Sequence, residues 1–406
     1  MMKLKKYIYG VALGAFSLTF ASCYNADKEF SDYEGGTTAY FAYQYPIRTL
    51  VLGNDIYNND LDNAHKCQIW ATMGGAYGGR NATVDIVVDE SLCDNLWFPD
   101  EGGNPKDSVL PLPHDFYNYD ELASTVINYN GEPRGYVEVK FTDKFFSSDK
   151  TMKTTYVIPL RMTNVSGIDR ILTGTPLEGT NPVRTNTEEW SVLAKDYVLY
   201  CVKYMNPWEG KYIRRGVDKI QDGALYSEVV RKDMSLVNTD VEHYKENPVN
   251  ANDEVCSIKT KNMTQAIFPV SFNIGKDVHG NRPSQKCTLL LTFSGDNCTI
   301  TSEDEDVPST GSGEFIVKGT EKAEYKDYQW GSMNGQPVQR DILRLSYNVT
   351  FKKGRVIGKY TVKEGNKEVE KDWILENDIT ISTTDTLVVQ TRDANKREFF
   401  EPKYVK

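Results

Sequence analysis

The stretch TVDIVVD, residues 83–89, decides the fold class of this chain. Val84, Ile86 and Val88 fall at every second position, with Asp85 and Asp89 between and after them. Successive side chains of a β-strand point to opposite faces of a sheet, so a period of two predicts a strand with one buried face. The run is also too short and too rich in β-branched residues for a helix, which favours an all-β protein.

The same pattern recurs along the first half of the chain. In GYVEVKFTD (135–143), Val137, Val139 and Phe141 alternate with polar residues. Further runs of this kind are TAYFAYQYPIRTLVLG (38–53), KCQIWATMGG (66–75), TTYVIPLRMTN (154–164) and DYVLYCVKYMN (196–206). About seven short strands separated by turns predict an immunoglobulin-like antiparallel sandwich over residues 38–206.

The second half, residues 207–406, contains about eight more such runs joined by short turns, for example KCTLLLTFSG (286–295) and DILRLSYNVTFKKG (341–354). Closing the edges of these strands requires either a barrel or two packed sheets. We therefore expect an antiparallel β-barrel or β-sandwich as a second domain, and the sequence leaves that choice open. No βαβ alternation appears, which argues against nucleotide-binding folds.

The first 22 residues have the composition of an export signal. Three lysines precede an apolar run that is too short to span a bilayer. Ala21 and Ser22 stand before Cys23 as in a lipobox, so we expect cleavage before Cys23 and lipidation of its thiol. An ordinary secretory signal is the alternative. Residues 23–37 are polar, acidic and glycine-containing, which indicates a flexible tether.

Charge and motifs exclude several classes of function. The formal charge is −10, and removing a leader with three lysines and no acid makes it −13, which disfavours binding to nucleic acid. No Walker, GxSxG, HExxH or GxGxxG motif occurs. Without these motifs, we predict no catalytic residue and no cofactor. The cysteines form no CxxC, so we expect no metal site. Cys287 and Cys298 could form a short-loop disulfide.

A resemblance adds to this interpretation. The segments that carry it lie between Tyr45 and Tyr212: YPIRTLVLG, ATMGGAYG, VDESLC, LPHDFYNY, GYVEVKFTDKFF, YVIPLRMTN, ILTG and YVLYCVKYMNPWEGKY. They resemble the N-terminal domain of unknown function of a family of Bacteroidota surface lipoproteins. In that family the domain precedes endo-glycosidase or lectin-like domains in glycan-utilisation gene clusters. The second half resembles its usual uncharacterised companion domain, with a weaker match.

The resemblance implies a lipid-anchored outer-membrane protein that faces the cell exterior and works beside an outer-membrane importer. It provides no catalytic residues to carry over. The tether acids Asp27, Glu29 and Asp32 are similar to a surface-export signal, although Lys28 interrupts them. Oligosaccharide is the expected ligand.

Sugar rings stack their C–H faces on exposed aromatic side chains, with amides and carboxylates beside them, so loops that combine these groups are candidate sites. The candidates for glycan binding are Trp330, Tyr328, Asp327 and Asn334 in YKDYQWGSMNGQP (325–337), and Trp97 and Phe98 in LCDNLWFPDEGGN (92–104). Trp97 and Phe98 could instead cap the sandwich core. Trp70, between Ile69 and Ala71, is expected in the core, and Trp208 at the domain junction.

These observations predict a non-enzymatic glycan-binding lipoprotein of a polysaccharide-utilisation system. Two alternatives stay open. One is a structural or adhesive surface protein that binds another protein. The other is a glycoside hydrolase, which would require two carboxylates about 5–9 Å apart, and the 57 acidic residues do not single out such a pair.

Overall fold

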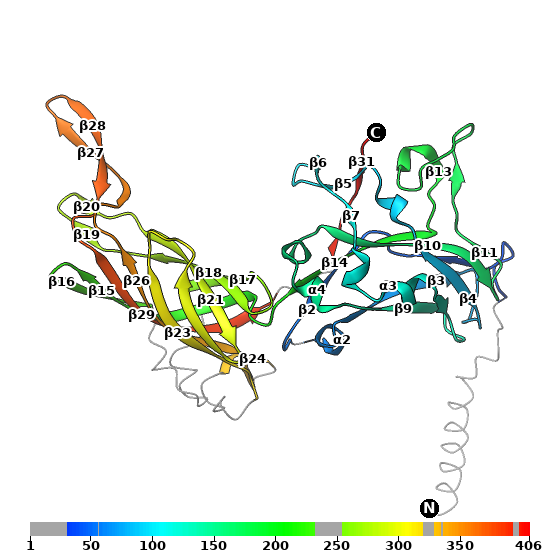
Figure 1. Cartoon of the computed structure of the whole chain (residues 1–406), viewed down its shortest axis with the longest axis horizontal. Helices are drawn as coiled ribbons and strands as arrows, with labels where there is room; N and C mark the ends of the chain where they lie inside the picture. Colours follow the sequence, from blue (N-terminus) through cyan, green and yellow to red (C-terminus); the bar gives the residue numbers. More distant parts are fainter. Residues whose placement is uncertain (1–30, 56, 232–253, 320–328, 334–335, 393–397) are drawn as a thin grey trace, which may run out of the picture.

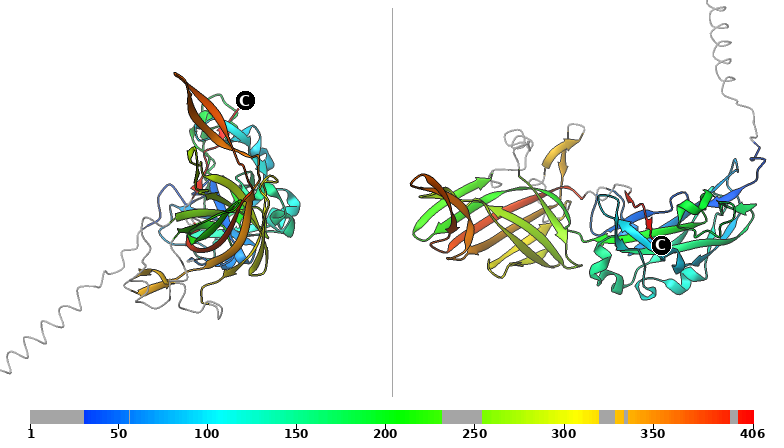
Figure 2. Two further views of the ribbon diagram at one scale, coloured as in Figure 1. Left: turned by 90° about the vertical axis from the view of Figure 1, so that its left-hand side faces the viewer. Right: turned by 90° about the horizontal axis from the view of Figure 1, so that it is seen from above.

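The computed structural model describes residues 31–55, 57–231, 254–319, 329–333, 336–392 and 398–406. Two β domains lie end to end along the long axis of the molecule (Figure 1). The first is an open, strongly curved half-barrel, and the second is an eight-stranded barrel, as the two further views also show (Figure 2). The expected all-β class is therefore confirmed.

Eleven strands of the described chain form the main sheet of the first domain. In spatial order they are β11 (Arg170–Ile171), β1 (Thr38–Tyr40), β3 (Lys66–Gly74), β9 (Arg134–Lys140), β8 (Val126–Asn128), β4 (Thr83–Val88), β10 (Tyr156–Ser166), β14 (Tyr197–Met205), β2 (Pro46–Val51) and β30 (Glu398–Phe399), with β7 (Leu110–Pro111) beside β10. Three pairs are parallel, namely β1 with β11, β7 with β10 and β2 with β14, whereas the sequence predicted antiparallel pairing throughout. The parallel pairs arise because β2 and β7 are each separated in sequence from the strands they join, which a hairpin pattern cannot reveal.

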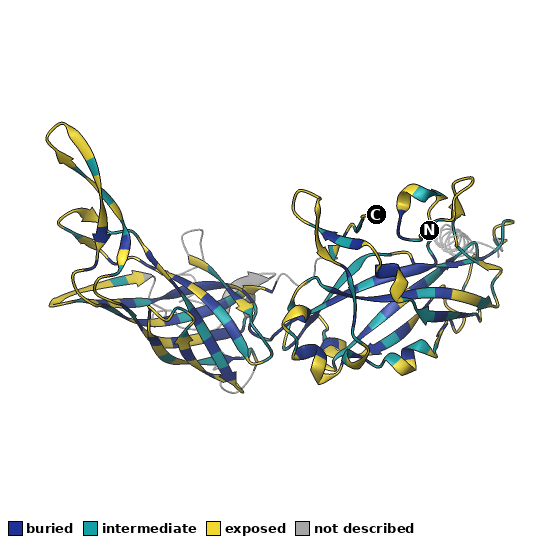
Figure 3. Cartoon of the chain, turned by 45° about the horizontal axis from the view of Figure 1, so that its top comes forward, coloured by how far each residue is buried: buried dark blue, intermediate teal, exposed yellow. Residues whose placement is uncertain are grey.

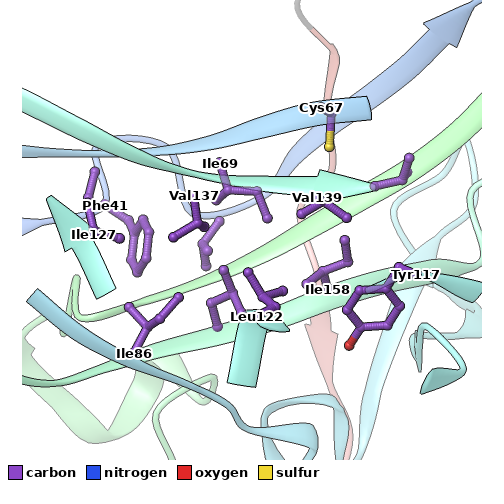
Figure 4. Close-up of a cluster of buried hydrophobic side chains, with 14 of the residues drawn as sticks. Phe41, Cys67, Ile69, Ile86, Tyr117, Leu122, Ile127, Val137, Val139 and Ile158 are labelled. Carbon is purple, nitrogen blue, oxygen red and sulfur yellow. The ribbon is translucent and has the colours of Figure 1, made fainter. Parts of the chain in front are cut away.

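The core of this domain fills the inside of the curved sheet (Figure 4). In β4 the alternation seen in the sequence buries Val84 and Ile86, and in β9 it buries Val137 and Val139. Short helices close the open side of this core: α3 (Tyr119–Ala123) contributes Leu122, and α4 (Asp143–Phe146) contributes two buried phenylalanines. The remaining short helices are α2 (Asp60–Asn63), η1 (Glu90–Cys93), η2 (His114–Phe116), η3 (Asp149–Met152) and η4 (Thr187–Glu189).

A small sheet forms a second layer on the outer face of β10 and β14. It consists of β31 (Lys403–Tyr404), β5 (Leu96–Pro99) and β6 (Pro105–Ser108). Leu96, Phe98 and Phe400 of this layer pack with Val157 and Leu199 of the main sheet. A two-stranded hairpin, β12 (Thr175–Pro176) with β13 (Trp190–Val192), completes the domain.

The second domain is a closed antiparallel barrel. Its strands are β15 (Gly210–Asp222), β17 (Glu254–Thr260), β18 (Gln265–Phe272), β21 (Gln285–Ser294), β22 (Asn297–Ser302), β23 (Ser309–Ile316), β26 (Ile342–Phe351) and β29 (Ile379–Thr391), and pairing of β15 with β29 closes the ring. β16 (Leu225–Arg231) extends the far half of β15. Apolar side chains fill the interior, so of the two expected architectures the barrel is the one observed.

Three hairpins stand on the barrel: β19 (Lys276–Asp277) with β20 (Gly280–Asn281), β24 (Gln329–Met333) with β25 (Gln336–Gln339), and β27 (Val356–Glu364) with β28 (Lys367–Ile374). The hairpin of β27 and β28 projects away from the barrel and is mostly exposed (Figure 3).

The chain end departs from the expected boundary of 207–406. β30 pairs with β2 and β31 pairs with β5, so Glu398–Tyr404 lies in the sheets of the first domain. Phe400, buried against Phe98, provides the physical reason, because its ring completes the layer between the small sheet and β14. The end of a chain can return to an earlier domain without any local sequence signal, which explains the difference.

The six cysteines of the described chain are free thiols, so Cys287 and Cys298 do not form the disulfide considered above. Burial raises the pKa of both thiols to about 12, which keeps them protonated and unreactive. Within the described residues, no helix has the length and apolar character needed to cross a bilayer. The same residues contain no cluster of three or more His, Cys, Asp or Glu side chains able to hold a metal ion.

Candidate functional site

The half-barrel has a seam where its sheet does not close. One wall of the seam is the edge of β3, which pairs with β1 only from Thr72 to Gly74 and has no strand partner on this side from Lys66 to Ala71 in the described structure. The other wall is formed by β2, β14 and β30. The Tyr200 hydroxyl on β14 crosses the seam and donates a hydrogen bond to the Gln68 carbonyl of β3, at 3.3 Å.

A cavity of about 410 Å³ opens along this seam. We call it the seam groove, and its lining residues are Tyr43, Pro46, Ile47, Arg48, Thr49, Gln68, Ile69, Trp70, Arg134, Val198, Tyr200, Glu398 and Phe399. Its volume lies in the range typical of small-molecule sites. Tyr200 satisfies one carbonyl of the free edge of β3, that of Gln68, and the groove occupies the space that a further strand would have filled.

Exposed aromatic rings stand on both walls of the seam groove. On one side Trp70 and its cross-strand neighbour Tyr136 lie with ring centroids 4.6 Å apart, and their side chains are 41% and 44% exposed. On the other side Tyr43 and Phe399 lie 5.4 Å apart and are 55% and 49% exposed. Of these four half-exposed rings, Trp70, Tyr43 and Phe399 line the groove, and large aromatic residues gathered in this way at a surface indicate a binding surface, because a folding core would have buried them.

Charged side chains border these rings. The guanidinium carbon of Arg134 lies 4.6 Å from the centroid of the Trp70 ring. Arg48 forms an ion pair with the buried carboxylate of Asp62. On the same wall as Arg48, Glu398 of β30 accepts a hydrogen bond from the Lys203 ammonium at 2.9 Å.

The pKa values at this site follow from burial. Burial raises the pKa of Asp62 above its usual value, although the Val51 N–H at 2.9 Å and the charge of Arg48 oppose that shift. Burial also raises the pKa of Tyr200 well above the usual value for a phenol. Tyr200 therefore stays a neutral hydrogen-bond donor across the seam at all ordinary pH values.

The structure tests only part of the sequence-predicted site. Cys23, Asp327, Tyr328 and Asn334 lie outside the described residues. Trp330 lies in β24, which pairs with β25 in a hairpin. The structure describes the backbone of this strand and not the Trp330 side chain.

Trp97 and Phe98, both in β5, have different surroundings. Phe98 is 5% exposed and packs on Phe400 with ring centroids 4.8 Å apart. Its prediction as a sugar platform is wrong, because neither face of a buried ring is accessible to a ligand. Trp97 is partly buried and lines a separate cavity of about 500 Å³ with Asp94 and Asn95, which shares no lining residue with the seam groove.

Two other expectations for tryptophans are corrected. Trp70 was expected in the core, but Ile69 and Ala71 point inward and leave Trp70 on the opposite face of β3. The period of two in KCQIWATMG was the signal that could have found it. Trp208 was expected between the domains, but it stacks on Phe293 inside the barrel core, 3.7 Å between centroids and 6° between planes.

The fold and groove define a two-domain, all-β protein with an open, groove-bearing half-barrel and a closed companion barrel. A family model described as "Domain of unknown function (DUF5627)" matches residues 207–393, which corresponds to the barrel. A second family model, described as an N-terminal domain, matches residues 33–169 of the half-barrel. Comparison with curated proteins gives no match.

A solved structure is similar over nearly the whole molecule. It is a Bacteroides ovatus protein described as "structural genomics, unknown function", determined at 2.40 Å resolution. The two sequences are 34% identical, the match covers 92% of this chain and 100% of that one, and the TM-score is 0.70. The chain therefore belongs to the same family as this Bacteroides protein, with a domain of unknown function as its C-terminal half.

Proposed function

We propose that this protein binds an oligosaccharide in the seam groove without modifying it chemically. The observation that carries the proposal is the set of exposed aromatic rings, Trp70, Tyr43 and Phe399, that line a cavity of about 410 Å³. The C–H face of a pyranose stacks on such rings, while its hydroxyl groups need hydrogen-bonding partners beside them. Gln68 supplies an amide at the same groove.

Two carboxylates support binding over hydrolysis: Glu398, which lines the groove, and Asp62, which pairs with the lining residue Arg48. Glycoside hydrolysis generally uses two carboxyl groups that flank the scissile bond. Asp62 is 2% exposed, and its oxygens already accept from Arg48 and from the Val51 N–H. Glu398 is paired with Lys203. A glycoside hydrolase is accordingly the weaker alternative for this groove.

The same proposal includes the cellular setting. Lipidation at Cys23 would hold the protein in the outer membrane, facing the exterior, beside an importer that takes up the captured oligosaccharide. The leader sequence and the family resemblance support this setting. We expect a Cys23→Ala variant to remain in the soluble fraction after cell lysis; recovery of that variant in the membrane fraction would contradict the anchor.

Titration of the purified full chain against plant, yeast and host oligosaccharides tests the proposal, with an assay of new reducing ends in the same samples. Trp70→Ala should abolish binding, and Tyr226→Ala is the matched control because it removes an exposed aromatic ring from β16 of the barrel. Trp330→Ala separately tests the site predicted from sequence. Loss of binding with Trp330→Ala and not with Trp70→Ala would move the site to the barrel hairpin, and new reducing ends would indicate a hydrolase.

If no glycan of the panel binds, the adhesive alternative gains support. In that case the seam groove would be an interface for another protein.

A further inference from the structure

The guanidinium of Arg134 is the charged group of the seam groove that no carboxylate neutralises. It is exposed at the end of β9 and lies over the Trp70 ring. Among the described residues, no carboxylate forms an ion pair with it. A cation–π contact uses the face of the guanidinium plane, so the N–H groups along its edge remain able to donate.

Three acidic side chains beside the groove and on β9 are already paired. Asp62 is bound to Arg48, and Glu398 is bound to Lys203. Glu138, the next residue on the same face of β9 as Tyr136, forms an ion pair with Lys66 at 3.0 Å. Arg134 therefore gives the groove a local positive charge in a chain whose formal charge is −10.

This arrangement determines which oligosaccharides fit best. A planar carboxylate pairs with a guanidinium edge through two parallel hydrogen bonds, and such charge-assisted bonds are about twice as strong as neutral ones. Arg134 covers part of the indole, so a sugar that stacks on the exposed remainder of Trp70 would hold a carboxylate substituent next to the guanidinium, whose carbon is only 4.6 Å from the ring centre. Neutral hydroxyl groups would not use the charge of Arg134.

We propose that the seam groove prefers acidic oligosaccharides, in which the sugar stacks on the aromatic walls and its carboxylate pairs with Arg134. This inference rests on the proposed function and specifies its ligand class. A carboxylate can come from a uronic acid or from a sialic acid. Both provide the same chemistry to Arg134, so the experiment must distinguish them.

Two matched ligand pairs provide that experiment. Tetragalacturonic acid is compared with its methyl-esterified form, and sialyllactose with lactose, by calorimetric titration of the full chain at low salt. In at least one pair the acidic member should bind about tenfold more tightly, the effect of one hydrogen bond to a charged group. The pair that shows the preference identifies the source of the acid. The preference should shrink as salt is added.

Variants then assign the preference to one residue. Arg134→Gln should bring the acidic and neutral members within about twofold of each other. Arg170→Gln is the matched control, because it removes an exposed arginine from the same domain and should leave the preference unchanged. A preference that survives in Arg134→Gln overturns the assignment, as does equal binding of acidic and neutral members by the unmodified chain.

The two levels of the proposal fail in different ways. Equal binding of acidic and neutral sugars, with loss of both in Trp70→Ala, would overturn the acid preference and leave glycan binding intact. Failure of all four ligands and of the wider glycan panel would overturn the proposed function itself.

Discussion

The two domains consist of similar strands, but the main sheet of the first domain stays open and that of the second closes into a barrel. In the barrel, β15 pairs with β29 along its whole length, from Lys211 opposite Thr391 to Asp222 opposite Ile379. In the half-barrel, β3 and β2 do not pair, and the seam groove lies between them. Closure pairs the edges of β15 and β29, leaves β16 at the end of the sheet, and gives an interior filled with side chains. An open seam leaves edges and aromatic faces available to a ligand.

The interior of the barrel shows what closure requires of polar groups. Arg214 is 1% exposed and donates to the Asp385 carboxylate at 2.9 Å, to Glu254 at 3.0 Å and to the Tyr347 hydroxyl at 3.1 Å. Tyr347 in turn donates to Asp385 at 2.8 Å. Burial raises the pKa of Tyr347 far above its usual value, so the hydroxyl keeps its proton for that bond. Within this network the charges of Arg214 and Asp385 each have a partner, as a low-dielectric interior demands.

The largest expected effect is the loss of one partner from this network. Asp385→Ala leaves the Arg214 charge buried without its nearest carboxylate, and we expect it to destabilise the barrel by about 3–5 kcal/mol. Urea unfolding followed by circular dichroism measures this change. An unchanged midpoint would show that water reaches Arg214, and the contrast between a closed interior and an open seam would then not hold.

Two further variants keep this test informative if Asp385→Ala does not fold. Tyr347→Phe removes one hydroxyl from the network and should cost about 1–2 kcal/mol. Glu370→Ala is the matched control, because it breaks an exposed ion pair with Lys359 on the projecting hairpin. Its urea midpoint should equal that of the unmodified chain.

The next effect concerns the junction between the domains. Arg392 follows β29, is 9% exposed, and donates to the carbonyl groups of Leu52 at 2.7 Å, Asn54 at 3.1 Å and Glu209 at 3.1 Å. It also donates to the Asn206 carbonyl. The Arg392 side chain of the barrel therefore donates hydrogen bonds to backbone carbonyl groups of the first domain and of the segment that joins the two domains.

Arg392→Ala leaves these carbonyl groups without their donor, and we expect a loss of about 2–3 kcal/mol. Because the lost bonds join the domains, unfolding should separate into two transitions, one for each domain. Differential scanning calorimetry of the variant and of Arg392→Lys, which should lie in between, measures the separation. A single transition at the original temperature would mean that the strands β30 and β31 alone hold the domains together.

The comparison also explains what the sequence could predict. Alternation in runs such as TVDIVVD identified the β class and most strands of both domains, because one-sided burial appears directly in a period of two. The same alternation, applied to β3, places Trp70 on the face opposite Ile69, so the exposure of Trp70 at the groove could have been predicted from the sequence. Whether a sheet closes depends on pairing between distant strands, and no local pattern encodes it.

The other aromatic wall could not have been found in this way. Tyr43 lies near the start of the first domain and Phe399 near the chain end, and they meet because β30 pairs with β2. Loop composition instead favoured Phe98, which the small sheet buries. Composition identifies residues able to bind sugar, but only tertiary structure decides which of them remain exposed.

A smaller effect is expected at the hydrogen bond that crosses the seam. Tyr200→Phe removes the donor to the Gln68 carbonyl, and because that carbonyl lies beside the groove, water can replace the donor. We expect a loss of about 0.5–1.5 kcal/mol. Hydrogen exchange of the β3 amides should rise while that of the barrel stays constant. Equal changes in both domains would show that Tyr200 acts through global stability and not through the seam.

The smallest effect on stability is expected for Trp70→Ala, the same variant that should abolish glycan binding. Its side chain is 41% exposed and contacts chiefly Tyr136 and Arg134, so removal costs at most about 1 kcal/mol, the value of an aromatic cross-strand pair. Ile69→Ala, one position away on the buried face, should cost about 2–5 kcal/mol. Urea unfolding of both variants measures the difference. If Trp70→Ala destabilises the domain as much as Ile69→Ala, then Trp70 contributes mainly to folding stability. The proposal that the seam groove is a binding site would then lose its main support.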